Sequence, residues 1–143
     1  MVSFDTFVRR FTKLPKYIEK QGLKVIMSEA KRIVQMQREQ HHAGVNREGN
    51  KMQSGYSSQY GKRRKKKGLQ TSFVDLHYSG KYHKSLNLVP VKGGVDVQSD
   101  EPYAYYLRGM FPKMAGLTKS NADIVAEAVA DKLAVDIKKY LVK

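Results

Sequence analysis

This chain is organised around residues 61–86, which contain Lys62-Arg63-Arg64-Lys65-Lys66-Lys67 and then Asp75-Leu76-His77-Tyr78-Ser79-Gly80-Lys81-Tyr82-His83-Lys84-Ser85-Leu86. Six adjacent cations cannot enter a core unpaired, because burying an unpaired charge costs more than its contacts return. We therefore expect the cation run to stay in water or to meet an anionic partner. The second segment mixes aromatic, hydroxyl and glycine residues, which predicts an ordered turn. We expect Ser79-Gly80 to open that turn, or a short helix, with Tyr82 and Leu86 facing the core.

Two amphipathic helices are predicted before this stretch. The first can be capped by Ser3 and ends or restarts at Pro15. Its apolar residues recur at helical spacing: Phe4, Phe7, Val8, Phe11 and Leu14. The second is longer and runs from about Lys16 to about His42. We expect both apolar stripes to pack on the protein's own core or on a neighbouring subunit, although a basic first helix could also lie on a membrane surface.

A long basic loop is expected at about residues 44–70. The segment holds five glycines, eight basic residues and one acidic residue, and so carries +7 of the chain's formal net charge of +14. It is too long and polar for a routine connection inside a compact domain. We expect part of it to be mobile in isolation and to be ordered by a partner.

The second half of the chain predicts a small sheet followed by a helix. Thr71–Val74 is a candidate short strand, and Leu86–Val91 with Val95 and Val97 predicts a hairpin that turns at Lys92-Gly93-Gly94. Met110–Leu117 has the pattern of an extended surface segment. A final helix should open at Ser120, with Asp123 three residues later as in a capping box. The expected fold is α+β in a single domain, residues 1–143: two N-terminal helices (one long), a small antiparallel sheet with a hairpin, and a C-terminal helix packed on the sheet.

The composition argues against an enzyme. There is no cysteine, so a thiolate metal site is excluded. His41 and His42 are adjacent and diverge by about 100° on a helix, and His77 and His83 have no nearby pair of carboxylates. We therefore expect no metal, no cofactor and no catalytic residues. No apolar run has the length of a signal-peptide core or a membrane span, so a soluble intracellular product is expected.

The cation run itself leaves two kinds of partner open. Lys62–Lys67 can neutralise nucleic-acid phosphates without sequence preference, and Tyr56, Tyr60 and Tyr78 are close enough in sequence to add stacking on bases. An acidic protein surface would suit the run equally. A magnesium-dependent nuclease using Asp75 and Asp100 is a third, weaker alternative.

Several motifs in order resemble a known family. They are Asn46-Arg47-Glu48-Gly49-Asn50-Lys51, then Tyr56-Ser57-Ser58-Gln59-Tyr60 with the basic residues after it, the turn of residues 75–86, and Pro102-Tyr103-Ala104 with Gly109. This arrangement resembles the virion-morphogenesis and tail-completion proteins of tailed bacteriophages, which sit at the neck between portal and tail. In the family-like turn, the matching positions are Ser79, Gly80, Tyr82, Ser85 and Leu86.

The resemblance implies a non-enzymatic structural protein that works as a ring of identical subunits. Its partners would be other neck, portal or tail proteins, with possible non-specific contact to DNA in the channel and none to a membrane. It would be found in the virion, and in the host cytoplasm during assembly. The alternative interpretation is a small basic nucleic-acid-binding protein that uses residues 62–67.

Overall fold

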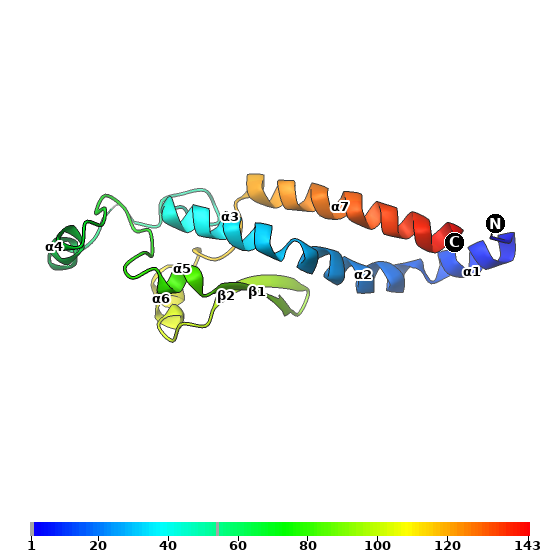
Figure 1. Ribbon diagram of the computed structural model, residues 1–143, viewed down its shortest axis with the longest axis horizontal. Coiled ribbons are helices and arrows are strands. Elements are labelled where there is room, and N and C mark those ends of the chain that lie inside the picture. The colour runs from blue at the N-terminus through cyan, green and yellow to red at the C-terminus, as the bar shows by residue number, and fades with distance from the viewer. Residues whose placement is uncertain (1, 54) are drawn as a thin grey trace.

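The computed structural model describes residues 2–53 and 55–143 as an elongated molecule, in which helices run along the long axis and a small sheet lies against one of them (Figure 1). The predicted α+β fold is confirmed. The described residues form helices α1 (Phe4–Thr12), α2 (Leu14–Ser28), α3 (Ala30–His42), α4 (Ser58–Lys66), α5 (Lys81–Lys84), α6 (Ala104–Met110) and α7 (Lys119–Val142), and strands β1 (Leu86–Val91) and β2 (Gly94–Ser99).

The N-terminal helices follow the apolar pattern with shifted boundaries. Ser3 caps α1 as predicted, because its hydroxyl accepts from the N–H of Thr6. Pro15 does not delay the next helix, which already begins at Leu14, since proline is tolerated in a first helical turn. The single helix predicted from Lys16 to His42 is divided at Glu29, whose N–H bonds back to the carbonyl of Ile26 in a tightened turn.

The C-terminal helix α7 runs beside α2 and reaches α1 (Figure 1). Tyr17 stacks on Tyr140 with 3.9 Å between ring centroids, and Arg10 donates to the carbonyl of Tyr140 at 3.1 Å. Thr118, not the predicted Ser120, caps α7, because its hydroxyl accepts from the N–H of Asn121. Helix α7 therefore packs on α2 and α1 in the part of the molecule that carries the termini (Figure 1).

The hairpin is confirmed and packs against α3. Leu86 pairs with Ser99 and Val91 with Gly94, and the chain reverses through Lys92-Gly93, where Gly93 takes the left-handed φ that such a turn requires. Val125 brings the first part of α7 into the same core. The buried cluster is made of Ile33, Val34, Tyr82, Leu86, Leu88, Val97, Ala104, Met114 and Val125.

Two local predictions are wrong. Thr71–Val74 forms no strand, although Val74 is buried. Residues 110–117 are not a surface segment, because Met110 ends α6 and Met114 is only 1% exposed. The second segment also packs Phe111, Ala115 and Leu117 against the core. The backbones of both segments follow irregular paths, and periodicity does not reveal such a pattern.

Candidate functional site

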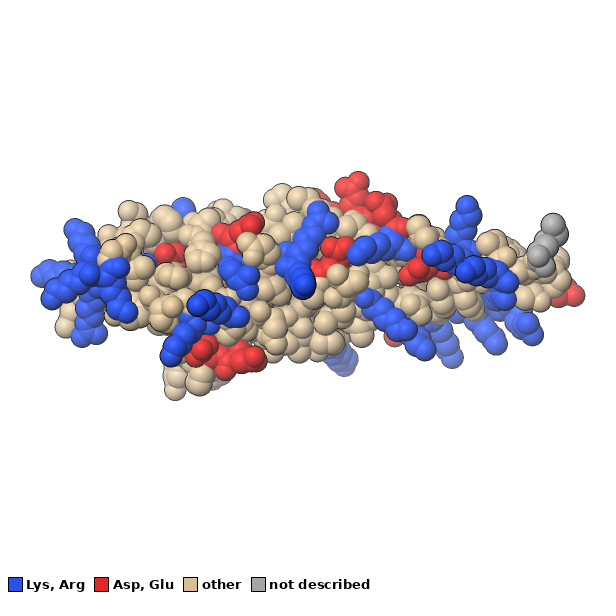
Figure 2. Space-filling view, in the orientation of Figure 1, with Lys and Arg blue, Asp and Glu red and all other residues tan. Residues whose placement is uncertain are grey.

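The cation run forms a helix instead of a loop. Ser57 caps α4 by accepting from the N–H of Tyr60, and the left-handed Gly68 follows its end. Lysine and arginine are good helix formers once a cap is present. The loop predicted at residues 44–70 is therefore wrong for Ser58–Lys66. Figure 1 places α4 at one end of the long axis, and Figure 2 shows Lys and Arg side chains gathered around that end.

Arg64 is the exception within the run, because it is buried and only 1% exposed. Its guanidinium donates to the Asp75 carboxylate at 3.0 Å, to the carbonyl of Gln70 at 2.9 Å and to the carbonyl of His77. The anion that Arg64 meets is thus supplied by the chain itself, and its burial removes Arg64 from the residues predicted to contact DNA or a partner. Burial is tolerable here because the charge is paired and its donors are occupied. The other five side chains are exposed: Lys62, Arg63, Lys65, Lys66 and Lys67.

Asp75 is the acceptor at the centre of this arrangement. Besides Arg64, it accepts from the Gln70 amide at 2.9 Å, the Tyr56 hydroxyl at 2.9 Å and the His77 N–H at 3.0 Å. Burial alone would raise the pKa of Asp75, but these hydrogen bonds and the Arg64 charge outweigh it and hold the pKa below its ordinary value. The carboxylate thus stays ionised and anchors α4 to the segment before α5. The weaker nuclease alternative loses its first candidate ligand to this structural role.

The three tyrosines named for base stacking are brought together beside α4. The Tyr56 and Tyr60 rings are 5.3 Å apart, and Tyr60 and Tyr78 are 5.8 Å apart. The Arg64 guanidinium lies 4.2 Å from the centroid of Tyr56, and the Lys67 ammonium lies 4.1 Å from that of Tyr78. The pKa of Tyr56 is raised to about 12, chiefly by burial. Cations and aromatic faces therefore alternate over one small area.

A cavity of about 720 Å³ lies between this tyrosine group and helices α5 and α6. Its walls are largely aromatic and aliphatic, with Arg64 as the charged side chain among them. The side chains that define its two sides include Tyr60, Tyr78, Tyr103, Leu107 and Phe111. A cavity of this size and lining can receive an apolar side chain of a partner or a small ligand.

The family-like turn connects the tyrosine group to the hairpin. Gly80 has φ +84°, and α5 follows at once, as predicted. Tyr82 and Leu86 are buried in the core, also as predicted. Ser85 donates to the carbonyl of Tyr82 at 2.8 Å and meets the hydroxyl of Ser99, while the Ser79 hydroxyl accepts from the N–H of Lys81. These residues set the direction of the chain as it enters β1.

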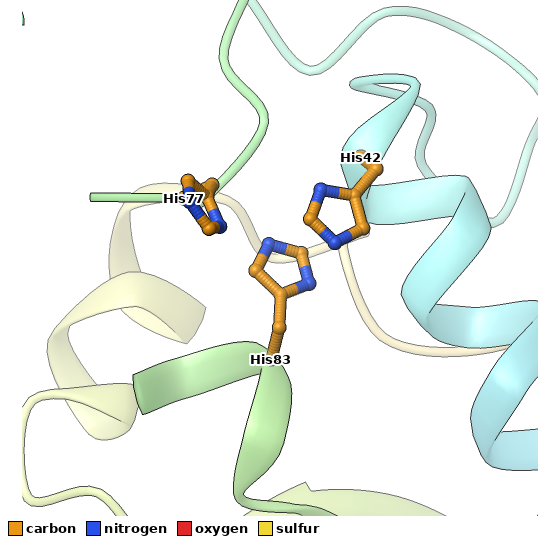
Figure 3. Close-up of side chains that lie close together, drawn as sticks. All are labelled: His42, His77 and His83. Carbon is orange, nitrogen blue, oxygen red and sulfur yellow. The ribbon is translucent and has the colours of Figure 1, made fainter. Parts of the chain in front are cut away.

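Three histidines, His42, His77 and His83, converge next to helix α5 (Figure 3). They come from the end of α3, the irregular chain before α5, and α5 itself, and one ring nitrogen from each lies within 4.8 Å of the others. The sequence predicted no relation among these residues, because no local spacing connects them. His41 is not part of this group, because its Nε2 donates to the carbonyl of Met114 at 2.8 Å, although its ring centroid lies 6.2 Å from that of His83.

Burial favours the neutral form of two of these rings, His83 and His42. Burial, with a smaller contribution from neighbouring His42, lowers the pKa of His83 to about 4, and burial also lowers the pKa of His42. The rings of these two residues stack at 3.8 Å with an angle of 9°. An uncharged imidazole nitrogen offers a lone pair, and among the described residues these three histidines are the group that could hold a metal ion.

Within residues 2–53 and 55–143, none of the helices combines the length and apolarity required to span a bilayer. No protein-family profile, curated protein or solved structure matches this chain.

Proposed function

We propose that this protein is a non-enzymatic structural subunit of a multi-chain assembly, and specifically a ring-forming neck or tail-completion subunit of a tailed bacteriophage. The observation that carries the proposal is a pair of exposed apolar patches. The α1 patch consists of Phe4, Val8 and Phe11, and the α6 patch consists of Tyr105, Tyr106 and Met110. Phe4 is 79% exposed and Tyr105 is 81% exposed, which is unusual for such large apolar side chains unless a partner covers them.

The placement of the patches supports head-to-tail assembly. The α1 patch belongs to the end of the molecule that carries both termini, whereas α6 lies toward the α4 end (Figure 1). Contact between two different patches on identical subunits is heterologous, and such contacts generate a ring if the rotation closes. The motifs that resemble the neck family also support a ring of identical subunits, and the proposed location in the virion rests on that resemblance.

The assembly proposal is tested by replacing Phe4 and Phe11 with serine. We expect the wild-type protein to form a discrete multimer in native mass spectrometry, alone or with a portal-side or tail-side partner. The double variant should be monomeric and should keep its melting temperature, because both side chains are largely exposed in the free chain. Arg9→Ser, on the same helix, is the matched control and should leave the multimer intact. A wild-type chain that is monomeric in every mixture and missing from purified particles would overturn the proposal.

A second candidate function is sequence-independent binding of nucleic acid by α4. Its support is the group of five exposed cations at one end of the molecule (Figure 2). Three tyrosines lie beside the same helix, and the Lys67 ammonium lies 4.1 Å from the ring centroid of Tyr78. Replacing Lys62, Lys65, Lys66 and Lys67 with glutamine, with Arg64 kept, should weaken duplex DNA binding uniformly across sequences. The salt slope should flatten by about 0.9 for each phosphate that is no longer neutralised. The control neutralises Lys138, Lys139 and Lys143 at the far end of α7, and equally weakened binding in both variants would contradict a role specific to α4.

A further inference from the structure

We propose that His42, His77 and His83 form a binding site for a divalent transition-metal ion, for which Zn²⁺ is the appropriate probe. The first support is convergence. Three imidazoles from three separate segments face one another (Figure 3), with one ring nitrogen from each lying within 4.8 Å of the other two. Zinc–imidazole bonds of about 2.0–2.1 Å place tetrahedral ligand nitrogens roughly 3.4 Å apart. Closing the site therefore requires ring rotations that shorten these separations and direct the lone pairs to one point.

The second support is the hydrogen-bonding state of the two more enclosed rings. The Nε2 atom of His83 lies 2.9 Å from the carbonyl oxygen of Asp75. A carbonyl can only accept, so Nε2 carries the proton and Nδ1 keeps its lone pair. That Nδ1 atom, and the Nδ1 of His77, are buried without a hydrogen-bond partner in the described part of the chain. Metal-binding histidines characteristically hold one ring N–H against a carbonyl and present the other nitrogen to the ion.

The third support is that the ring nearest to solvent is free to adjust. His42 is exposed, and its side chain makes no hydrogen bond within the described residues. In the structure it stacks on His83, so ion binding would require the two rings to leave their parallel arrangement and direct their lone pairs to one point. The exposed rim also leaves a fourth coordination position for water or for a ligand from a partner.

The ligand set selects the class of ion. Three neutral imidazoles without a carboxylate or thiolate suit zinc, copper or nickel, whereas magnesium and calcium prefer oxygen ligands. A bound ion would join the end of α3, the segment that follows Asp75 and helix α5. It would therefore hold these three segments in one arrangement, next to α4 and the tyrosine group.

The test uses tag-free, full-length protein freed of metal by a chelator. Titration calorimetry with Zn²⁺ should show one ion bound per chain, and millimolar Mg²⁺ should not compete. Zn²⁺ should raise the melting temperature, and Co²⁺ in its place should give the visible absorption of a tetrahedral nitrogen-ligated ion. His42→Ala should weaken Zn²⁺ binding at least tenfold and abolish the rise in melting temperature. This variant should fold, because the side chain is exposed.

Two further variants keep the outcome clear. His77→Ala should weaken binding to a similar extent, whereas Gln35→Ala, on an exposed position of the same helix as His42, should bind as the wild type does. Absence of saturable Zn²⁺ binding by the wild type would overturn the proposal. So would a His42→Ala chain that binds Zn²⁺ with unchanged affinity. These measurements need only the isolated chain, so their result does not depend on the assembly role.

Discussion

Arg64 differs from its neighbours in the cation run because its charge is directed inward. Its guanidinium is enclosed by Asp75 and two backbone carbonyls, so removal of the side chain leaves a buried carboxylate without its cation. We expect Arg64→Ala to lower the free energy of unfolding by about 3–5 kcal/mol, as is typical when one partner of a buried pair is removed. Urea denaturation measures the change.

The adjacent Arg63 is the matched control for that experiment. It is exposed, and Arg63→Ala should change the free energy of unfolding by less than about 0.5 kcal/mol. Similar destabilisation of the two variants would show that Arg64 is not distinguished by its burial. Arg64→Lys should recover only part of the stability, because an ammonium cannot reproduce the fork geometry of the guanidinium.

Gly44, just after α3, occupies a position where both conformation and space exclude a side chain. Its φ is +70°, and an added Cβ would lie 2.5 Å from Cδ2 of Phe73 and 2.8 Å from the carbonyl oxygen of Val74. Gly44→Ala should cost about 2–4 kcal/mol from left-handed strain and overpacking together. Gly49 has a similar φ of +83° but nothing within 4 Å, so Gly49→Ala should cost only about 1–2 kcal/mol. Thermal unfolding measures both changes. A lower melting temperature for Gly49→Ala than for Gly44→Ala would contradict this explanation.

At the scale of elements, the end of α3 organises the irregular chain around it through buried polar side chains. The Gln37 carboxamide oxygen accepts from the N–H of Gly116 at 2.7 Å, and His41 donates to the carbonyl of Met114. Gln40 accepts from the N–H of Thr118 and from the Asn121 amide, both at 2.9 Å, and donates to the carbonyl of Gly116 at 3.0 Å. The start of α7 is therefore tied to α3 by hydrogen bonds as well as by the apolar packing of Val125.

This arrangement predicts a large effect for Gln40→Ala. The substitution removes three hydrogen bonds and leaves partly buried backbone groups without partners, so the free energy of unfolding should fall by about 2–4 kcal/mol. Gln35→Ala, one turn or so earlier on an exposed position, should be nearly neutral. Hydrogen exchange should localise the effect, with faster exchange at the amide of Thr118 in the Gln40 variant alone. Equal protection of that amide in both variants would show that the Gln40 hydrogen bonds do not hold the start of α7.

For the whole molecule, the formal charge of +14 gives the two proposed functions opposite salt dependences. Self-association through the apolar patches brings like-charged subunits together, so added salt should strengthen it by screening their repulsion. DNA binding by α4 releases counterions and should weaken as salt rises. Sedimentation velocity and fluorescence anisotropy between low salt and about 0.5 M salt would measure both trends. Self-association that weakened as salt rose would show that the subunits are joined by ion pairs and not by the apolar patches.

The features that were predictable from the sequence are those carried by neighbouring residues. Ser3 before an apolar stripe, the valines on either side of Lys92-Gly93, and Ser79-Gly80 before α5 each act within a few residues, so their backbone conformations could be inferred directly. The prediction from neighbouring residues was wrong at residues 58–66. Glycines and charge predicted a loop there, whereas Ser57 caps a helix made of good helix formers. At these residues the N-cap and the helix propensity of lysine and arginine favour a helix, and they outweigh the glycines and the charge repulsion that favour a loop.

The candidate sites depend on partners that are distant along the chain. Arg64 was indistinguishable from five other cations until folding brought Asp75 against it, and His42 had no visible relation to His77 or His83. Periodicity and turn chemistry report the conformation of the backbone, so neighbouring residues determined α1, the hairpin and the turn before α5. Burial, ion pairing and the convergence of ring nitrogens are properties of distances across the fold, and they arise only once the separate segments have packed together.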